Sequence, residues 1–385
     1  MKMKNIFIIG ARGYHASYGG WETFVSNLVD YYNDSNTRFY VGVLTENEEK
    51  DKVLEKVNDN LYLNYIYVNK DMGSPKMFLY TIKSYIECLK FIKKNNLKDS
   101  YIYVLGLKLG PMLWFNKLLR KKYNIKIMVN PDGLEHKRNK WNKIVKFCFL
   151  LSEWSMVNHS SMVICDSLGI QNYIEDRYKK VKGKTAYIAY GAKEYDFNNI
   201  DEDKILKEYK LKKDEYCLMV GRCVPENNYE LVINEFMKSK IKKDLIIITN
   251  LSSSNYYQEL IEKTGCKKDK RIKFINGVYD GDKLATIRKN AYLYIHGHSV
   301  GGTNPSLIEA ISLTDLNILY DVCFNHDIGV DTCLYFKDEG SLTKILNDKK
   351  MMDDSKKRLG SKAKELFYSK FTWEKIVEEY KKIFK

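Results

Sequence analysis

The stretch Ile6-Phe7-Ile8-Ile9 is an apolar run that ends at Gly10, and a helical pattern starts soon after it, near Trp21. A short apolar run closed by glycine is typical of a buried strand followed by a tight turn. The connection also contains Gly19 and Gly20, and glycines there let backbone N–H groups approach an anion at the start of the next helix. It matches neither a P-loop nor G-x-G-x-x-G. The sequence therefore predicts a strand–loop–helix unit whose loop contacts an anionic ligand.

This strand–helix alternation continues along the whole chain, which predicts parallel sheets and an α/β fold with two doubly wound domains. The expected strands are Ile6–Ile9, Phe39–Leu44, Leu61–Val68, Tyr101–Leu105, Ile125–Val129, Met162–Cys165, Ala186–Ala189, Tyr216–Val220, Leu245–Thr249, Ile272–Ile275, Tyr292–Ile295 and Ile318–Tyr320. The expected helices include Glu22–Tyr32, Met77–Lys93, Trp141–Trp154, Glu226–Met237, Asp282–Lys289, Ser306–Leu313 and a C-terminal helix after Thr372. We place the domain boundaries at 1–192, 193–368 and 369–385.

Composition narrows the class of protein. A chain of 385 residues with 44% hydrophobic residues is long enough for two cores. No stretch of about 18 consecutive residues is apolar, and the N-terminal apolar run is too short for a signal peptide, so we expect a cytoplasmic protein. The eight cysteines form no C-x2-C pair, so we expect buried thiols and no metal.

The positive charge is concentrated in the first half. The net charge is +15, with 31 basic against 19 acidic residues in 1–195 and 33 against 30 in the remainder. Residues 101–150 hold 11 basic and 2 acidic side chains together with Trp114, Phe115, Leu118, Leu119, Trp141, Phe147 and Phe149. Basic residues beside interfacial aromatics predict peripheral contact with an anionic membrane on its cytoplasmic face. A basic surface also suits a phosphorylated ligand.

Three further loops follow predicted strands and carry polar groups. His296–Asn304 contains Gly301 and Gly302, and its end can cap a helix that starts with Pro305, so free N–H groups there would face a phosphate. Glu309 lies in the apolar part of that helix, where a carboxylate can accept bonds from ribose hydroxyls.

The loop after Val129 contains Asp132, Glu135, His136 and Arg138, a richer set than a turn requires. After the strand Tyr216–Val220, the chain runs Gly221-Arg222 and then Pro225, which we expect to start a helix. A guanidinium at that position can bind a diphosphate.

Taken together, these strings resemble the family 4 glycosyltransferases of the GT-B fold, and among them bacterial rhamnosyltransferases that build capsule and cell-wall polysaccharides. The similarity rests on Ile8-Ile9-Gly10-x-Arg12-Gly13, Tyr18-Gly19-Gly20-x-Glu22-Thr23-Phe24, Asp132-Gly133-Leu134-Glu135, Pro225-Glu226-Asn227-Asn228, His296–Leu307 and Tyr320-Asp321-Val322-x-Phe324-Asn325. It implies two facing Rossmann-like domains with a cleft between them, the first binding an acceptor and the second a nucleotide-sugar, and a C-terminal helix that crosses back onto the first.

The resemblance also implies the residue roles. We expect donor contacts from Arg12, Gly19, Gly20, Arg222, Asn227, His298, Gly301, Gly302, Thr303, Asn304 and Glu309, acceptor contacts from Asp132, Glu135, His136 and Arg138, and catalysis by Asp132 and Arg222. Two positions depart from the wider family, because Gly301 stands where a first glutamate is usual and Asn227 where a lysine is usual. Both departures fit the rhamnosyltransferase branch.

The resulting hypothesis is a retaining, metal-independent transferase that moves L-rhamnose from dTDP-rhamnose to a lipid-linked saccharide acceptor, with no nucleic-acid partner. Two alternatives stay open: the same fold with a UDP-hexose donor, and a non-catalytic module that binds anionic membranes. An NAD-type oxidoreductase is disfavoured because no G-x-G-x-x-G follows a strand.

Overall fold

The computed structural model describes residues 3–15, 20–73, 75–131, 133, 136, 142–251 and 255–385. The chain divides into two compact units, Met1–Ala189 with Trp373–Lys385, and Tyr190–Thr372. We call them unit 1 and unit 2. The boundary lies three residues before the predicted one, and residues 369–372, which we had assigned to the C-terminal segment, belong to unit 2.

Unit 1 is built around an eight-stranded sheet in the order β3-β4-β2-β1-β5-β6-β7-β8. All neighbours pair in parallel except β3 with β4. The strands are β1 Lys4–Ile9, β2 Thr37–Thr45, β3 Leu54–Asn58, β4 Leu61–Tyr67, β5 Tyr101–Leu105, β6 Lys126–Asn130, β7 Met162–Cys165 and β8 Thr185–Tyr187. The helices are α1 Gly20–Tyr31, α2 Lys76–Lys94, α3 Met112–Phe115, α4 Lys117–Tyr123, α5 Lys143–His159, α6 Leu168–Arg177 and α15 Trp373–Ile383.

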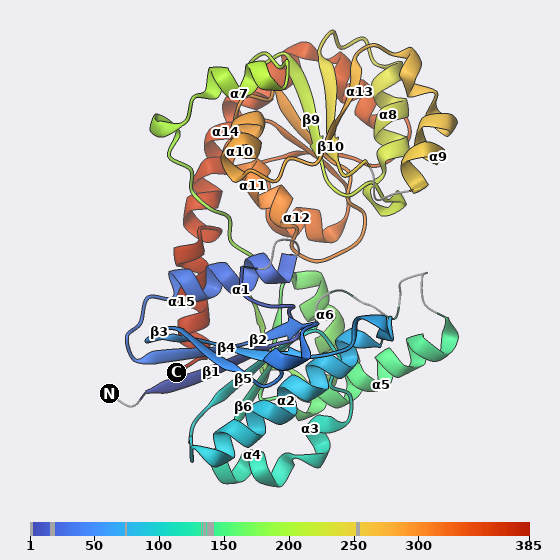
Figure 1. Ribbon diagram of the computed structural model, residues 1–385. Helices are drawn as coiled ribbons and strands as arrows, with labels where there is room; N and C mark the ends of the chain where they lie inside the picture. Colours follow the sequence, from blue (N-terminus) through green and yellow to red (C-terminus); the bar gives the residue numbers. More distant parts are fainter. Residues whose placement is uncertain are drawn as a thin grey trace. The chain divides into compact units, whose positions relative to one another are not determined.

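Alternation along β1 sends successive side chains to opposite faces of this sheet. Phe7 and Ile9 pack with Tyr85 and Leu89 of α2, and Figure 1 shows α1 and α15 over the other face. The last helix, α15, is fixed there by a hydrogen bond of 2.9 Å between the hydroxyls of Tyr380 and Tyr103. A segment at the far end of the sequence thus completes the core of unit 1.

Unit 2 has a six-stranded, wholly parallel sheet in the order β11-β10-β9-β12-β13-β14. The strands are β9 Tyr216–Val220, β10 Asp244–Thr249, β11 Ile272–Asn276, β12 Leu293–His296, β13 Asn317–Tyr320 and β14 Leu334–Phe336. The helices are α7 Glu202–Glu208, α8 Tyr229–Lys238, α9 Asn255–Thr264, α10 Gly281–Lys289, α11 Pro305–Leu313, α12 Cys323–Gly329, α13 Ser341–Asn347 and α14 Lys349–Lys370.

Helices cover both faces of this second sheet (Figure 1). Cys217 and Met219 of β9 pack towards α8 and α13, while Tyr216 and Leu218 pack towards α7 and α10. The strand order is that of a Rossmann fold, in which the chain first extends the sheet on one side of its first strand and then on the other. Both units therefore are doubly wound, as the sequence predicts.

One helix differs from its predicted bounds in a way that bears on the site. The helix expected from Glu226 starts only at Tyr229, after a single 3-10 turn over Pro225–Asn227. Asn228 separates the two with a φ of 53°, and its side-chain amide donates to the backbone oxygen of Gly297 at 2.8 Å. A tertiary bond thus holds Asn228 in a left-handed conformation that no helix continues through. Among the described helices, none combines the length and the hydrophobicity needed to cross a bilayer.

Candidate functional site

The direction of chain winding locates the ligand edge in each unit. In doubly wound sheets, ligands bind beyond the carboxyl ends of the strands where the strand order reverses. In unit 2 this point lies between β9 and β12, so the loops that start at Gly221 and Gly297 are the candidates. In unit 1 it lies between β1 and β5, so the loops that start at Gly10 and Gly106 are the candidates.

Side-chain amides fasten the loops of unit 2 to one another. Each amide donates to a backbone oxygen of its own or a neighbouring loop. The bonds are Asn227 Nδ2 to Arg222 O at 2.8 Å, Asn228 Nδ2 to Gly297 O at 2.8 Å, and Asn325 Nδ2 to His298 O at 3.0 Å and Tyr320 O at 2.8 Å. Gly297 is required at its position, because a Cβ there would lie 2.3 Å from the backbone oxygen of Asn227. Asn227 therefore shapes this edge as a structural residue.

Two histidines stack inside this edge. The rings of His296 and His298 lie 4.1 Å apart with an interplanar angle of 7°. Burial, with a further contribution from Arg222, lowers the pKa of His298 to about 4, and burial with His298 and Arg288 holds the pKa of His296 well below its usual value. His296 Nε2 and His298 Nδ1 are buried and find no hydrogen-bond partner among the described residues. Both rings are therefore neutral at pH 7. Nδ1 of His298 remains able to form a hydrogen bond that no described residue supplies.

Arg222 follows β9 as the sequence predicts, and its side chain is exposed. It forms no ion pair with a carboxylate of the described residues, although its charge is felt at His298. An arginine that is near buried histidines and lacks a carboxylate leaves its full charge for an anionic ligand.

Glu309 lies on α11 and is held by an arginine that sequence reasoning did not select. Its Oε2 contacts Arg288 Nη1 at 2.6 Å, and Arg288 Nη2 donates to Ser306 Oγ at 2.9 Å. The side chain of Arg288 is only 3% exposed, whereas that of Glu309 is 31% exposed. The buried arginine orients the carboxylate while part of it stays accessible, which is the arrangement a ribose ligand needs.

The start of α11 corrects one expectation. Pro305 has no N–H, the N–H of Ser306 donates to Asn304 Oδ1 at 3.0 Å, and those of Leu307 and Ile308 donate to the backbone oxygen of Asn304. The first turn of the helix is thus already satisfied by its own cap and offers no free N–H to a phosphate.

Two backbone amides just before the cap are instead the candidates for binding a phosphate. The backbone N–H groups of Gly301 and Gly302 have no partner among the described residues. Gly301 is exposed and has a φ of 133°, which favours glycine. Thr303 is buried and Asn304 caps the helix. Any anion at this loop would therefore bind at the glycines.

The loop after β1 in unit 1 is held through its backbone. The N–H of Arg12 donates to Oε1 of the buried Glu22 at 2.8 Å, while the side chain of Arg12 is exposed. Gly10 has a φ of 103°, and a Cβ there would lie 2.2 Å from the backbone oxygen of Leu105. Gly20 is the first residue of α1 and is exposed. The expected strand–loop–helix unit is present.

His136, an expected acceptor residue, contacts a carboxylate that we did not anticipate. Its Nδ1 lies 3.4 Å from Oε2 of Glu153 on α5, and its Nε2 lies 3.4 Å from the hydroxyl of Tyr173. Tyr173 and Tyr178 both donate to Oε1 of Glu153, at 3.0 and 2.7 Å, and burial with Glu153 raises the pKa of both tyrosines. Glu153 therefore connects His136 to α5 and α6.

Four expected site residues, Gly19, Asp132, Glu135 and Arg138, lie outside the described residues. The remaining ones fall at the carboxyl edges of the two sheets, each within its own unit. Neither Arg288 nor Glu153 carries a local signal: Arg288 is a cation in the last turn of α10, which the helix dipole favours anyway, and Glu153 resembles a solvated helix residue. Their contacts with Glu309 and His136, which are distant in sequence, can be recognised only in the structure.

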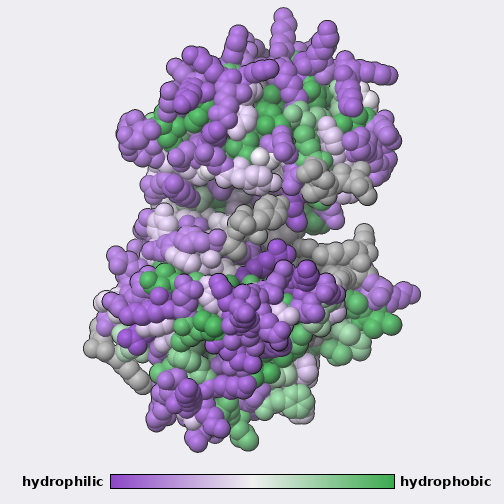
Figure 2. Space-filling view, viewed as in Figure 1, coloured by the Kyte–Doolittle hydropathy of each residue, from purple (hydrophilic) through white to green (hydrophobic). Residues whose placement is uncertain are grey.

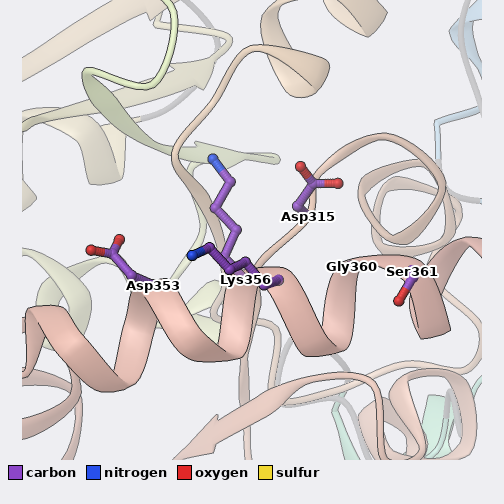
Figure 3. Close-up of a pocket in the computed structure, with 6 residues that line it drawn as sticks. Asp315, Asp353, Lys356, Gly360 and Ser361 are labelled. Atoms are coloured by element: carbon purple, nitrogen blue, oxygen red, sulfur yellow. The ribbon is translucent and has the colours of Figure 1, made fainter.

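A surface depression of about 440 Å³ in unit 2 lies elsewhere (Figure 3). It is formed by Asp315, just before β13, and by α14 residues such as Asp353, Lys356 and Gly360. Because it borders the amino end of β13, it is separated from the ligand edge by the length of the sheet. We assign it no role.

Sequence comparisons relate parts of this chain to known proteins. Residues 3–193 match a domain of unknown function, DUF1972. A curated relative, described as an uncharacterized glycosyltransferase from Methanocaldococcus jannaschii, is 26% identical over 233 residues, which are 58% of this chain and 57% of the relative. The chain thus spans little more than half the length of that relative.

Solved structures match over the whole chain. Sucrose-phosphate synthase from Thermosynechococcus elongatus has a TM-score of 0.74 at 16% identity, covering 100% of this chain and 98% of that one. A glycosyltransferase from Rickettsia africae has a TM-score of 0.73 at 15% identity, with coverage of 100% and 98%. Anabaena HepE in complex with UDP has a TM-score of 0.70 at 13% identity, with coverage of 100% and 99%. The protein has the two-domain, Rossmann-like GT-B fold.

Proposed function

We propose that the protein is a glycosyltransferase that uses a nucleoside-diphosphate sugar as donor. The observation that carries the proposal is the edge of unit 2, at the carboxyl ends of one sheet. There an exposed arginine side chain and two glycine amides, all without a partner among the described residues, lie with an oriented carboxylate. These are the groups that a diphosphate and a ribose require. The glycosyltransferase relative and the GT-B fold support the same activity.

In this proposal each group has a role in sugar transfer. Arg222 and the N–H groups of Gly301 and Gly302 bind the diphosphate and stabilise the charge that it gains as the bond to the sugar breaks. Glu309 accepts bonds from the ribose hydroxyls. Asp132 orients the acceptor hydroxyl or supports positive charge at the sugar carbon. The products are a glycosylated acceptor, with retained configuration, and a nucleoside diphosphate.

For the donor we propose dTDP-L-rhamnose and for the acceptor a lipid-linked saccharide, on the strength of the motifs that resemble rhamnosyltransferases. A UDP-hexose is the second candidate, favoured by the solved neighbours, since HepE is described in complex with UDP and with UDP-glucose. A thermal-shift panel separates the two, because a ligand that binds only the folded protein stabilises it by mass action. Stabilisation by dTDP-rhamnose above that by UDP-glucose and UDP-galactose is expected, and the reverse order would replace the donor.

The panel needs a control for non-specific anion binding. Arg222→Gln should abolish the shift from every nucleotide-sugar, whereas Lys240→Gln, which removes an exposed charge of unit 2, should leave it intact. No stabilisation by any nucleotide-sugar would contradict the proposed function itself.

We also propose that transfer needs no metal ion, because Arg222 and the glycine amides supply the positive partners of the leaving group. Initial rates in EDTA should equal those with added Mg²⁺. Full loss of activity in EDTA, restored by Mg²⁺ or Mn²⁺, would contradict this part of the proposal.

A further inference from the structure

Helix α5 presents four large apolar side chains to solvent. Its exposed positions include Ile144, Phe147, Leu151 and Trp154, which recur every three or four residues and so share one face. Its buried positions include the polar Ser152 and Glu153. The buried side also contains apolar side chains such as Phe149 and Met156. A helix on the surface of a soluble unit normally turns polar residues, and not a second apolar stripe, to solvent.

The neighbouring helices extend this apolar surface. Trp114 of α3 and Leu118 of α4 are also exposed, and the Trp114 ring contacts that of Phe115 at 5.2 Å. Helix α3 packs against both α4 and α5. We call six of the exposed apolar side chains on these helices the α3–α5 face: Trp114, Leu118, Ile144, Phe147, Leu151 and Trp154, which are between 51% and 85% exposed. Figure 2 shows hydrophobic side chains gathered over the part of unit 1 where Figure 1 places α5.

The polar contacts beneath the face show that α5 is held in this orientation. Ser152 Oγ donates to the backbone oxygen of Leu107 at 2.7 Å and accepts from the N–H of Gly110 at 2.9 Å. Arg120 of α4 donates to the backbone oxygens of His159 and Leu113, at 2.9 and 2.7 Å. Rotating α5 about its axis would break these buried bonds and would expose the buried side chains of Phe149 and Met156. The outward apolar face is therefore a stable property of the unit.

Exposed lysines lie on the same helices as this face and have no acidic partner among the described residues. Lys117, Lys121, Lys122 and Lys143 are exposed and form no ion pair with the described residues. Between Asp99 and Glu153 the sequence contains two acidic residues, Asp132 and Glu135. The structure corrects the set of apolar residues expected from sequence. Phe149 is buried, Leu119 is half-buried, and Trp141 lies outside the described residues, while Ile144, Leu151 and Trp154 join the face.

We propose that the α3–α5 face docks on an anionic phospholipid bilayer. Apolar side chains would enter the interface, tryptophans would lie at the headgroup level, and the lysines would contact the phosphates of the lipids. A protein partner of ordinary composition would need acidic residues opposite four lysines as well as an apolar core, whereas a bilayer with anionic lipid supplies both at once.

Docking would also orient unit 1. Helix α5 carries the face on one side and Glu153, which contacts His136, on the other. If the proposed function holds, docking therefore places His136, the described one of the expected acceptor residues, about one helix away from the membrane that contains a lipid-linked acceptor. Docking itself does not depend on that function and is measured without any sugar.

The test is co-sedimentation of the full chain with phosphatidylcholine vesicles that contain or lack phosphatidylglycerol. We expect sedimentation with the anionic vesicles at low salt, and release at about 0.5 M NaCl, where the Debye length falls to roughly 4 Å. A blue shift of tryptophan fluorescence should accompany binding, since Trp114 and Trp154 are exposed in the free protein.

Two matched pairs of variants test the face. Phe147→Ser with Trp154→Ser should weaken binding by at least about tenfold, given the apolar area of each ring, while Tyr279→Ser with Tyr368→Ser, at exposed aromatics of unit 2, should not. Replacing Lys117, Lys121 and Lys122 by Gln should weaken binding roughly fivefold per lysine. Replacing Lys267, Lys268 and Lys270 by Gln removes the same charge from unit 2 and should have little effect.

Three outcomes would overturn the proposal. One is equal sedimentation with neutral and anionic vesicles at low salt. Another is equal loss of binding in the face variants and their controls. The third is a dimer in solution that the Phe147 and Trp154 substitutions disperse, with no vesicle binding by the wild type, which would make the face an interface between two copies. Unchanged melting temperatures, expected at exposed positions, exclude misfolding as a cause.

Discussion

Two carboxylates, one in each unit, show how differently the same side chain is used. Glu153 in unit 1 accepts bonds from Tyr173 and Tyr178, lies near Arg177 and His136, and its side chain is 2% exposed. Glu309 in unit 2 contacts Arg288 through one oxygen and is 31% exposed. The first is enclosed by the protein, whereas the second is oriented by a buried partner and left open.

The two carboxylates differ in how much of each is left accessible to a ligand. A carboxylate with all its partners supplied by the fold contributes to stability and positions what surrounds it. A carboxylate with one fixed partner and accessible surface is prepared for a ligand. Substitutions of the enclosed and the open carboxylate, and of one further residue in each unit, test this distinction.

The largest effect is expected in unit 1, from Asp132→Asn. The change removes the charge that we propose to act at the reacting carbon, so turnover should fall at least about 100-fold. Donor affinity, which depends on unit 2, should change little. Single-turnover kinetics and donor titration of the same preparation give both numbers. A variant that melts much earlier, yet turns over at the wild-type rate when folded, would show that Asp132 serves only the turn.

The open carboxylate is tested by Glu309→Gln. Loss of the charge-assisted bonds to ribose should lower donor affinity by about 1.5–3 kcal/mol, or 10- to 150-fold. Because Arg288 is buried, the variant should also lose some stability, so affinity must be measured by calorimetry on protein shown to be folded. Unchanged donor affinity would reduce Glu309 to a partner of Arg288.

The enclosed carboxylate should behave in the opposite way. Glu153→Gln places an amide beside groups arranged for a carboxylate, so unit 1 should lose about 1–3 kcal/mol of stability, while donor affinity stays the same. All five tryptophans of the chain lie in unit 1, so urea unfolding followed by tryptophan fluorescence reports that unit alone. Glu262→Gln, at an exposed position of α9, is the control and should leave the curve unchanged. A weakened donor affinity in the Glu153 variant would contradict the comparison.

The smallest effect concerns pH at the edge of unit 2. An unfolded histidine binds a proton near pH 6.5, whereas folded His298 does so only at about 4. The stability that its neutral form contributes is present above pH 6.5 and is lost as the pH falls towards 4. Between pH 7 and pH 5 the free energy of unfolding should drop by about 1–2 kcal/mol on account of His298.

Calorimetric melting of the wild type and of His298→Gln across this range provides the measurement. The variant should show a shallower dependence on pH, and His326→Gln, at an exposed histidine of the same unit, should retain the wild-type slope. Equal slopes in the wild type and the His298 variant would mean that His298 is accessible to protons in the folded protein.

Much of the architecture was predictable because its signals are local. The strands Tyr101–Leu105, Met162–Cys165 and Tyr216–Val220 have the bounds expected from their apolar runs. Gly10 after β1 and Gly221 after β9 correctly indicated where the next loops begin. The short strands β3 and β14 were missed, since β3 is exposed throughout and neither has a long apolar run.

Contacts between distant segments decided the rest. Asn228 delays the start of the helix predicted from Glu226 to Tyr229, because its side chain bonds to Gly297. Asn304 and Pro305 satisfy the start of α11, which moves the free amides to the preceding glycines. Neither effect can be derived from helix propensity, because each depends on which groups meet in the folded unit.

The sequence by itself determined two doubly wound sheets and the loops at their carboxyl ends, because hydrophobic periodicity and glycine positions act over a few residues. Only the tertiary structure decided that Arg288 orients Glu309, that Glu153 is enclosed, and that α5 presents four large apolar side chains to solvent. Burial of a charge is tolerable only where partners from other segments compensate it, and those partners are brought together by the packing of the whole unit.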